Sequence, residues 1–405
     1  MKRFLAWAGL MLAACFGAVT TIGALAAFAP VAPSFALLIL VPLAAGVVMA
    51  ALLARLLASR AGVSGRFAAL FAGVLAALPL GGAVTAMLLS PALPTAPPGP
   101  DPRGPHRLLK TPAGSSLAWW SFAPANARQT PLVFVHGGPG IFVRTRDFEV
   151  GAAFRDMGFK TIYYDQSGGG VSGLLPITHY TLANAVADLE ALRVANGADK
   201  IVLWGQSWGA SLATSYVRAH PSRVAAVILD SPGDFPGEAY PLDYSKTDTD
   251  GGFQPTLRDA TLFLLIGHAP QLAEAWQSQE EARAIQQARV DGTKYVYGYQ
   301  CKDAPAPLAR PLSPPGGNLY PQLRLQADLE AAPRVTAPLS TVPVLLIRPG
   351  CDYLSPRTAE RYMAAFPNAR RVDVPGYGHA FYGHDDVLRD LLKRHAGPML
   401  AKLPG

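Results

Sequence analysis

Gly205-Gln206-Ser207-Trp208-Gly209 lies between an apolar run at 200–204 and a helix-like run at 210–219. In this order of strand, tight turn and helix, the pattern Gly-x-Ser-x-Gly is typical of a nucleophile elbow. The glycines on either side let strand and helix pack closely while the serine is held in a strained turn. Ser207 is therefore a candidate nucleophile, and an ordinary strand-to-helix turn is the alternative.

Strands alternate with helices on both sides of this turn. Further strand-like runs lie at 117–122, 132–135, 160–164, 224–229, 342–347 and 371–374. Further helix-like runs lie at 148–156, 181–196, 358–366 and 386–395. Such alternation predicts a mainly parallel, doubly wound sheet with helices on both faces.

The alternation stops between residues 235 and 339. Helix-like runs at 256–267 and 270–290 are followed there by a proline-rich stretch. The interruption predicts a helical cap over the carboxyl ends of the strands, where open α/β sheets bind ligands. The predicted core is then 106–234 with 340–405. Residues 90–105 are rich in proline and predict a semi-rigid extended linker.

Residues 1–89 have the composition of a membrane region. The first hundred residues contain no Asp or Glu and five basic residues. The basic residues before the first apolar run and between the second and third predict a cytoplasmic N-terminus by the positive-inside rule. Three spans then place the rest of the chain on the periplasmic or exterior side of a bacterial inner membrane. The apolar runs long enough to span a bilayer as helices are 4–29, 35–54 and 67–89.

A cleaved signal sequence is the alternative interpretation of the first span. The stretch Leu12-Ala13-Ala14-Cys15 is similar to a lipoprotein processing box. Processing there would leave two spans and put the domain on the opposite side, unless the arginines at 55–66 overrode it. Lipoproteins usually have a polar tether, whereas this mature end would begin with further apolar sequence.

Charge and cysteine content narrow the possible partners. The chain of 405 residues has a net charge of +7, and five of these charges precede residue 101, so the remainder carries only +2. The basic character therefore reflects membrane topology and does not indicate nucleic-acid binding. In the exported part, Cys301 and Cys351 are either a disulfide or two separate buried thiols.

Two further residues complete a set for nucleophilic catalysis. A serine hydroxyl needs a base to take its proton, and the base needs an acid to orient it. Asp352 and His379 each follow a predicted strand, and they occur in the order Ser, Asp, His that this architecture uses. Asp230 is the rival acid and His384 the rival base. This chemistry needs no metal or cofactor.

Stabilising the developing oxyanion requires two backbone N–H groups. Trp208, directly after Ser207, supplies one. His136-Gly137-Gly138-Pro139-Gly140 follows the strand at 132–135, so we assign the second to Gly138. A glycine-rich connecting turn is the alternative.

Together these motifs resemble the proline iminopeptidase family of α/β-hydrolases. The resemblance rests on the stretch 136–140, on Asp165-Gln166-x-Gly168-x-Gly170-x-Ser172 and on the elbow, and it extends over about 131–380. It implies an α/β-hydrolase fold and a serine peptidase that removes an N-terminal residue, often proline, from short peptides. The site residues that it implies are Ser207, Asp352, His379, Gly138 and Trp208.

The chain departs from that family in two ways. Ser167 stands where members usually have arginine, and a membrane anchor precedes a domain that is mostly soluble elsewhere. We expect a membrane-tethered aminopeptidase whose partners are small peptides and the lipid bilayer. The alternatives are an esterase or amide hydrolase acting on a small acyl substrate, and a catalytically silent binding module. Candidate cap carboxylates for a substrate α-amine are Glu238, Glu274, Glu280 and Glu281.

Overall fold

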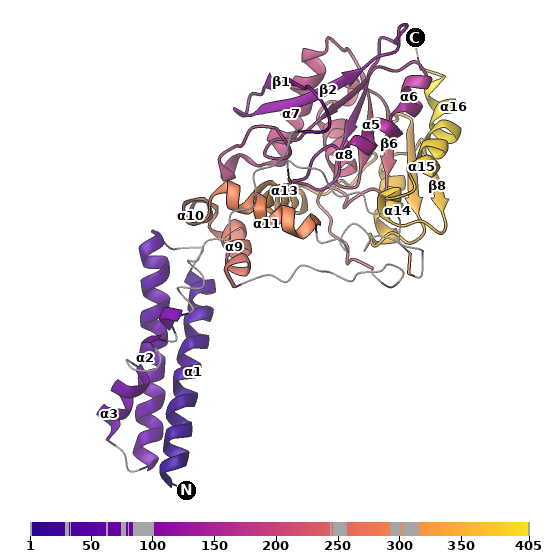
Figure 1. Cartoon of the computed structure of the whole chain (residues 1–405). Helices are drawn as coiled ribbons and strands as arrows, with labels where there is room; N and C mark the ends of the chain where they lie inside the picture. The colour runs from indigo at the N-terminus through magenta and orange to yellow at the C-terminus, as the bar shows by residue number, and fades with distance from the viewer. Residues whose placement is uncertain are drawn as a thin grey trace. The chain divides into compact units, whose positions relative to one another are not determined.

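The computed structural model describes residues 2–28, 32, 34–61, 64–73, 78–79, 81–83, 101–243, 245, 257–291, 301–302 and 316–403. The chain divides into two compact units (Figure 1). The N-terminal unit comprises Met1–Leu93 and Pro255–Ser278, and the sheet unit comprises Pro94–Gln254 and Gln279–Gly405.

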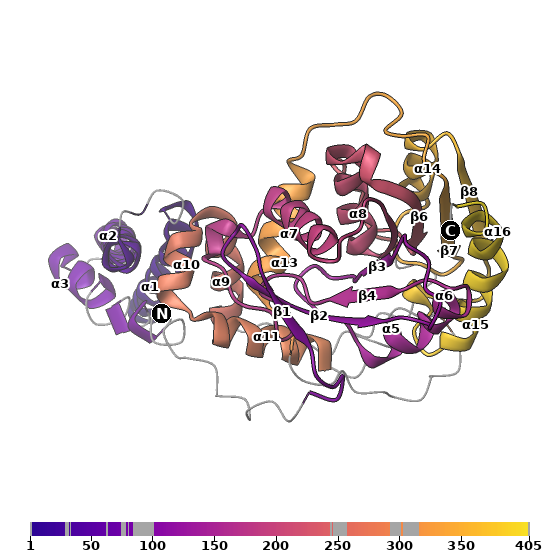
Figure 2. The same ribbon diagram turned by 90° about the horizontal axis from the view of Figure 1, so that it is seen from above.

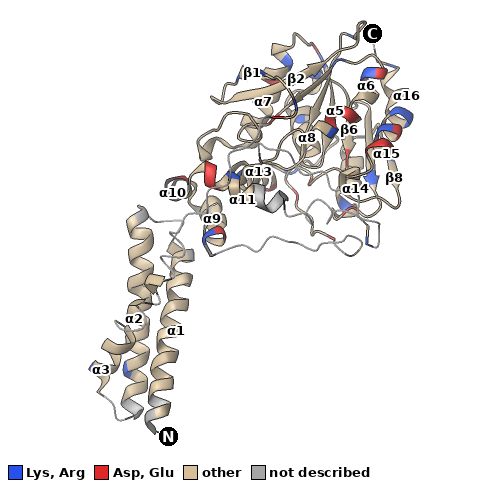
Figure 3. Cartoon of the chain, in the orientation of Figure 1, with Lys and Arg blue, Asp and Glu red and all other residues tan. Residues whose placement is uncertain are grey.

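Two long apolar helices dominate the N-terminal unit. α1 (Lys2–Phe28) and α2 (Phe35–Ala61) pack against each other, and Figure 3 shows few charged residues on either. Gly46 permits the close approach, because a methyl group there would lie 2.0 Å from Thr21 Oγ1. By length and composition, the segments Trp7–Leu25 and Ala36–Ala58 are able to cross a membrane.

Two candidate spans are thus found among the described residues, where three were predicted. The third predicted span, 67–89, is described only in part. Its first residues belong to the short helix α3 (Gly65–Leu70), which contacts α2, and residues 84–89 lie outside the described part of the chain.

The N-terminal unit also contains α9 (Leu257–His268) and α10 (Pro270–Trp276). The prediction of one helix over 270–290 is wrong. Gln277 has an extended backbone, with φ −138° and ψ 122°, and this conformation ends α10. A separate helix, α11 (Gln279–Asp291), begins two residues later and belongs to the sheet unit.

The sheet unit is built on one sheet of eight strands among the described residues. The strands are β1 (Arg107–Lys110), β2 (Ser116–Phe122), β3 (Leu132–Val135), β4 (Thr161–Tyr164), β5 (Ile201–Gln206), β6 (Val224–Asp230), β7 (Val344–Pro349) and β8 (Ala369–Val374). Their order is β1-β2-β4-β3-β5-β6-β7-β8. β2 is antiparallel to both neighbours, and all pairs from β4 to β8 are parallel. The predicted doubly wound, mainly parallel sheet is confirmed.

Helices cover both faces of this sheet (Figure 2). One face carries α7 (Leu182–Ala195), α8 (Trp208–Ala219) and α14 (Pro356–Ala365). The other carries α5 (Thr145–Val150), α6 (Ala152–Asp156), α15 (Asp385–Leu391) and α16 (Gly397–Leu400). The central strands are buried on both sides, as parallel strands between two helical layers must be. Their parallel arrangement brings the carboxyl ends of β3 to β8 to one edge.

The helix that precedes the last core strands was not predicted. α13 (Leu319–Glu330) follows the proline-rich stretch, and the Asn318 side chain caps it by accepting a hydrogen bond from Tyr320 N–H. Leu319, Leu325 and Leu329 are buried along one face. α13 packs against α7 and α11 within the sheet unit.

The last residues of the predicted linker fold onto the sheet unit. Arg103 is 8% exposed, and its guanidinium lies 4.4 Å from the centre of the Trp120 ring. Its Nη1 donates to Asp165 Oδ1 at 2.7 Å, while Asp101 pairs with the other side of the same guanidinium. Arg103 and its partner Asp101 therefore attach this end of the predicted linker to the core, although Pro102, Gly104 and Pro105 are exposed.

Candidate active site

Ser207 is held at the tip of a strained turn between β5 and α8. Its φ of 53° and ψ of −123° are uncommon for a residue with a side chain, and such strain is frequent at functional sites. Gly209 is required for the tight packing, because a methyl group there would lie 1.8 Å from the Val135 carbonyl oxygen. The local geometry is that of the predicted elbow.

The structure brings Asp352 and His379 into direct contact. His379 Nδ1 and Asp352 Oδ1 are 2.8 Å apart, and both side chains are almost fully buried. The same carboxylate oxygen accepts a hydrogen bond from Leu354 N–H at 3.0 Å. The Tyr353 ring packs on the imidazole, with centroids 4.7 Å apart. These contacts fix the imidazole plane and identify Asp352, not Asp230, as the partner of Nδ1.

A single turn after β6 connects the serine elbow to the histidine loop. Ser207 N–H donates to the Asp230 carbonyl at 3.0 Å, and Gly233 N–H donates to the Ser207 carbonyl at 2.9 Å. From the same turn, Ser231 Oγ accepts a hydrogen bond from Ala380 N–H at 2.9 Å. Residues 230–233 thus bind the backbone at Ser207 and the backbone beside His379.

Asp230 is a buried carboxyl within this turn. Its Oδ1 accepts from the Ser231 hydroxyl at 3.0 Å, and Gln206 Nε2 lies 3.4 Å from its Oδ2. Burial raises the pKa of Asp230 from 3.8 to about 6, against the opposing effects of these hydrogen bonds. The rival acid therefore lies close to the elbow, whereas the carboxyl at Nδ1 of His379 is that of Asp352.

The glycine turn after β3 lies beside the serine. A methyl group on Gly137 would be 3.1 Å from Ser207 Cβ and 3.7 Å from Ser207 Oγ. Gly138 has φ 123°, which glycine adopts without strain, and its peptide bond to Pro139 is cis. Trp208 is the first residue of α8, so its N–H has no acceptor one turn earlier in the helix. Both predicted oxyanion donors belong to segments that border Ser207.

Gln166 connects these two segments. Its side-chain Oε1 accepts from the Trp208 indole N–H at 2.9 Å, and its Nε2 donates to the His136 carbonyl at 3.0 Å. His136 is buried, and this burial lowers its pKa to about 3. Because His136 Nε2 accepts from Gln166 N–H, the neutral ring carries its proton on Nδ1, which donates to the Gly137 carbonyl at 2.7 Å. His136 therefore supports the glycine turn as a neutral side chain.

The loop that carries His379 is itself strained and supported. Ala380 and Phe381 both have positive φ, at 57° and 52°. Arg146 Nη2 donates to the Ala380 carbonyl at 3.3 Å and pairs with Asp385 at 2.7 Å. Sequence reasoning missed Arg146 and Ser231, because nothing in their local sequence distinguishes them from ordinary polar residues.

His384, the rival base, precedes α15 and packs edge-on against the Tyr377 ring, with centroids 5.1 Å apart. Asp385 and Asp386 occupy the first turn of that helix. In the part of the chain that the structure describes, no group of three or more potential metal ligands occurs. This arrangement fits a helix N-terminus with acidic residues in its first turn.

Cys301 and Cys351 form a disulfide, which settles the alternative left open by the sequence. Cys351 directly precedes Asp352, and its N–H donates to the Tyr377 carbonyl at 3.0 Å. The bridge therefore attaches a segment from the predicted cap to the turn that positions Asp352.

Of the four candidate cap carboxylates, Glu238 is already engaged. Its Oε1 lies 2.5 Å from Arg361 Nε, and its other oxygen accepts from the Tyr240 hydroxyl. Glu280 and Glu281 lie in the first turn of α11, while Glu274 belongs to α10. The Glu238 carboxylate therefore has two protein partners in this structure.

A family model described as the alpha/beta hydrolase fold matches residues 130–385. A proline iminopeptidase of Xylella fastidiosa (strain Temecula1 / ATCC 700964) is 34% identical over 108 residues, 26% of this chain and 33% of that protein. A probable proline iminopeptidase of Streptomyces coelicolor is 32% identical over 133 residues, 31% of this chain and 39% of that protein. The chain thus spans about a third of the length of these curated relatives.

Solved structures agree on the fold. An esterase from Exiguobacterium antarcticum superposes with a TM-score of 0.50 at 18% identity, covering 71% of this chain and 98% of the esterase. The family model covers more than half of the chain, and the strand order and the serine turn fit it. The chain therefore belongs to the α/β-hydrolase fold family, in which it resembles the proline iminopeptidases.

Proposed function

We propose that this protein is a membrane-tethered serine hydrolase in which Ser207, His379 and Asp352 form a catalytic triad. The observation that carries the proposal is the buried 2.8 Å contact between His379 Nδ1 and Asp352 Oδ1. The turn at 230–233, which binds the backbone of both the elbow and the histidine loop, supports the placement of Ser207 beside this pair.

In the proposed mechanism, Ser207 Oγ attacks the substrate carbonyl carbon while His379 Nε2 takes the hydroxyl proton. Asp352 holds the imidazole in the tautomer with the proton on Nδ1 and stabilises the imidazolium that forms. The N–H groups of Gly138 and Trp208 stabilise the oxyanion. His379 then gives its proton to the leaving group, and water, activated by the same imidazole, releases the acyl group from Ser207.

For the substrate, we propose the N-terminal residue of a short peptide. The support is the identity with curated proline iminopeptidases, which extends over about a third of their length. Among the described residues, the helices of the proposed cap, residues 235–339, that belong to the sheet unit are α11 and α13. Asn318 N–H, directly before α13, donates to the Gly140 carbonyl at 2.5 Å, which puts that helix beside the glycine turn.

We propose that α1 and α2 anchor the protein in a membrane and that the hydrolase domain faces an oxidising compartment. Both helices contain segments long and apolar enough to cross a bilayer. Disulfides persist in the periplasm and outside cells and are rare in the cytosol, so the Cys301–Cys351 bridge supports this side.

A panel of chromogenic substrates tests the reaction class. The full chain in detergent is assayed with amino-acid anilides that have a free amine, with their N-acetylated forms, and with short acyl esters. An aminopeptidase hydrolyses the free-amine compounds and rejects the blocked ones, because it must recognise the amine. Hydrolysis of esters and blocked amides alike would instead establish the esterase or amide hydrolase.

The matched variants are Ser207→Ala and Ser215→Ala. Ser215 is a buried α8 serine whose hydroxyl donates within the helix to the Ser211 carbonyl at 2.9 Å. Only the first change should abolish turnover and labelling by a fluorophosphonate. A wild-type protein that neither turns over nor reacts with the probe would contradict the triad and favour a silent binding module.

A further inference from the structure

One side of α11 carries three polar residues, Gln279, Arg283 and Gln286. Their spacing of four and then three residues places them in a row along the helix. A polar row on a helix normally faces water. Here Gln279 is 7% exposed, Gln286 is 3% exposed and Arg283 is half-buried, so the row faces other parts of the protein.

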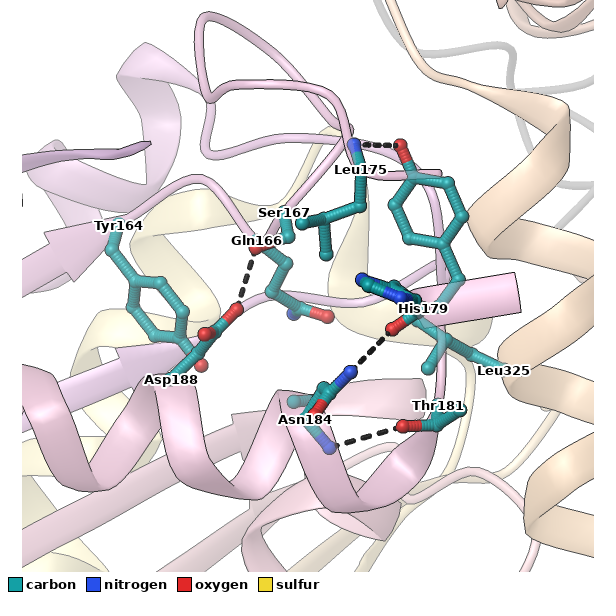
Figure 4. Close-up of a pocket in the computed structure, with 11 residues that line it drawn as sticks. Tyr164, Gln166, Ser167, Leu175, His179, Thr181, Asn184, Asp188 and Leu325 are labelled. Atoms are coloured by element: carbon teal, nitrogen blue, oxygen red, sulfur yellow. Dashed lines mark hydrogen bonds between the residues drawn. The ribbon is translucent and has the colours of Figure 1, made fainter. Parts of the chain in front are cut away.

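The Gln279 side chain is bonded to the connection between β4 and α7 and to the residue that caps α13. Its Nε2 donates to the Leu175 carbonyl at 2.7 Å, and its Oε1 accepts from the Tyr180 hydroxyl at 2.9 Å. The same oxygen lies 3.3 Å from Asn318 Nδ2. The Tyr180 hydroxyl in turn accepts from Leu175 N–H at 3.0 Å, which is one of the bonds drawn in Figure 4. Gln279 therefore joins segments that are far apart in the sequence.

Arg283 binds the first part of the same connection, one turn further along α11. Its Nη2 lies close to three backbone carbonyl oxygens. These belong to Gly168, Gly170 and Ser172, at 3.3, 3.2 and 3.5 Å. A guanidinium group has several N–H donors in a fixed plane, so it can hold more than one carbonyl at once. Arg283 thus holds the backbone of the loop 168–172.

This assembly is packed against the glycine turn. A methyl group on Gly169 would lie 2.1 Å from the Ile141 carbonyl oxygen. A methyl group on Gly317 would lie 2.6 Å from the Gly140 carbonyl oxygen and 2.7 Å from Gln286 Cγ. Because the predicted oxyanion donor precedes Gly140 by only two residues, a shift of α11 would be passed directly to it.

The connection between β4 and α7 also reaches the other oxyanion segment. Its residue Gln166 bonds to the Trp208 indole and to the His136 carbonyl. Figure 4 shows Gln166 and Leu175 on the wall of one small pocket, which Leu325 of α13 also lines. α11 and α13 therefore border the connection that carries Gln166.

We propose that Gln279 and Arg283 are positioning residues that hold the oxyanion donors in place from the side of the cap. The inference rests on the proposed function, because it assigns both residues to the same reaction. Oxyanion donors are effective only when they are aimed closely at the developing charge, so a looser turn costs rate. The two side chains do this by bonding to the connection between β4 and α7, and they need not touch the substrate.

Steady-state kinetics separate this role from substrate binding by the cap. Arg283→Met and Gln279→Leu keep the approximate size of each side chain but remove its hydrogen bonds. Each should lower kcat by about 10- to 100-fold and change KM less than about threefold, because the oxyanion forms only in the transition state. Arg283→Lys keeps the charge and N–H donors, so it should recover part of the lost rate. It is also the variant to use if Arg283→Met does not fold.

The matched control is Arg218→Met. Arg218 is an exposed arginine of α8 whose Nη1 also donates to a backbone carbonyl, that of Pro333, at 2.9 Å. Its replacement removes the same kind of bond without touching α11 or the glycine turn, and kcat should stay unchanged.

A second measurement does not depend on turnover. The full chain in detergent is labelled with a heavy nitrogen isotope at its tryptophan indoles, and the Trp208 signal is identified by its loss in Trp208→Phe. The Trp208 indole donates to Gln166 on the connection that Arg283 holds. Arg283→Met should therefore shift the Trp208 signal and speed its hydrogen exchange, whereas Arg218→Met should do neither.

The two measurements together decide the proposal. A higher KM at unchanged kcat would overturn it, because Gln279 and Arg283 would then act in substrate binding. An unchanged kcat and an unchanged Trp208 signal in both variants would also overturn it. A wild-type protein without turnover whose Trp208 signal still responds to Arg283→Met would count against the proposed reaction and would support the hold of α11 on the oxyanion segments.

Discussion

Ser231 Oγ and the backbone N–H of Ala380 are joined by a buried hydrogen bond of 2.9 Å across 149 residues of sequence. Ser231 is fully buried and has a φ of 48°, and Ala380 directly follows His379. The bond thus attaches the strained histidine loop to the turn that also holds the backbone of Ser207.

Loss of this hydroxyl should misplace His379. We expect Ser231→Ala to lower kcat by about 10- to 100-fold with little change in KM, because small misplacements of a catalytic group cost rate. Ser231→Gly removes the same hydroxyl but relieves the positive φ, so it separates the hydrogen bond from backbone strain. Full activity of the glycine variant would show that the hydroxyl is dispensable.

Substitution of Asp352 and of Asp230 should have different effects on kcat. Asp352→Asn should reduce kcat by about 10³- to 10⁴-fold, since the amide no longer selects the reactive imidazole tautomer. Asp230→Asn should have a much smaller effect, because the carboxyl that bonds to His379 Nδ1 is that of Asp352. Steady-state kinetics of both variants decide the matter, and comparable losses would argue against the assignment of Asp352.

Gly138→Ala should disturb the oxyanion donors. A methyl group there would lie 3.0 Å from Ile141 Cγ1, and φ 123° is strained for alanine. We expect kcat to fall by about 10²- to 10³-fold, as when one oxyanion donor is lost. The control is Gly114→Ala, which has a φ of 94° but open space around it. It should affect Tm alone, and a similar kcat loss in both would point to global strain.

The disulfide should stabilise the fold and help to hold Asp352 in position. Its cysteines are 50 residues apart, so the chain-entropy model assigns it about 4 kcal/mol. Cys301→Ser should therefore lower Tm, and it should lower kcat because the bridge attaches directly before Asp352. Cys15→Ser, which removes the free cysteine, is the control. Unchanged Tm and kcat in Cys301→Ser would show that the bridge is not needed.

Asp230 also predicts a pH dependence of stability. Burial raises its pKa in the folded state to about 6, above the ordinary value of 3.8. Its contribution to stability is therefore complete below about pH 3.8 and is lost as pH rises through about 6. The stability of Asp230→Asn relative to wild type should increase over that range, by up to roughly 3 kcal/mol. Denaturant unfolding at several pH values measures this, and a constant difference would refute it.

Local sequence patterns were sufficient for most of the fold. The strands β3 and β5 are buried on both sides, and their continuous apolar runs are enough to predict them without tertiary information. β1 was missed because it is an exposed edge strand, specified by its pairing with β2 and not by an apolar pattern of its own. The break after α10 was missed because no proline or glycine marks it.

For the candidate site, the sequence predicts only which residues follow neighbouring strands and in which order they occur along the chain. Asp352 and His379 follow neighbouring parallel strands, so their convergence could be expected. The bond between Ser231 and Ala380 depends on how two loops fold above the sheet edge, and no periodicity encodes that.

Arg103 has a practical consequence for isolating the hydrolase domain. Its guanidinium neutralises the buried Asp165, whose carboxylate also accepts from the N–H groups of Val143 and Val171. A truncated version starting at residue 106 would lack Arg103 and would leave the buried Asp165 carboxylate without this cationic partner. A soluble version for crystallisation should therefore start no later than Asp101, although the sequence predicts that this residue belongs to the proline-rich linker.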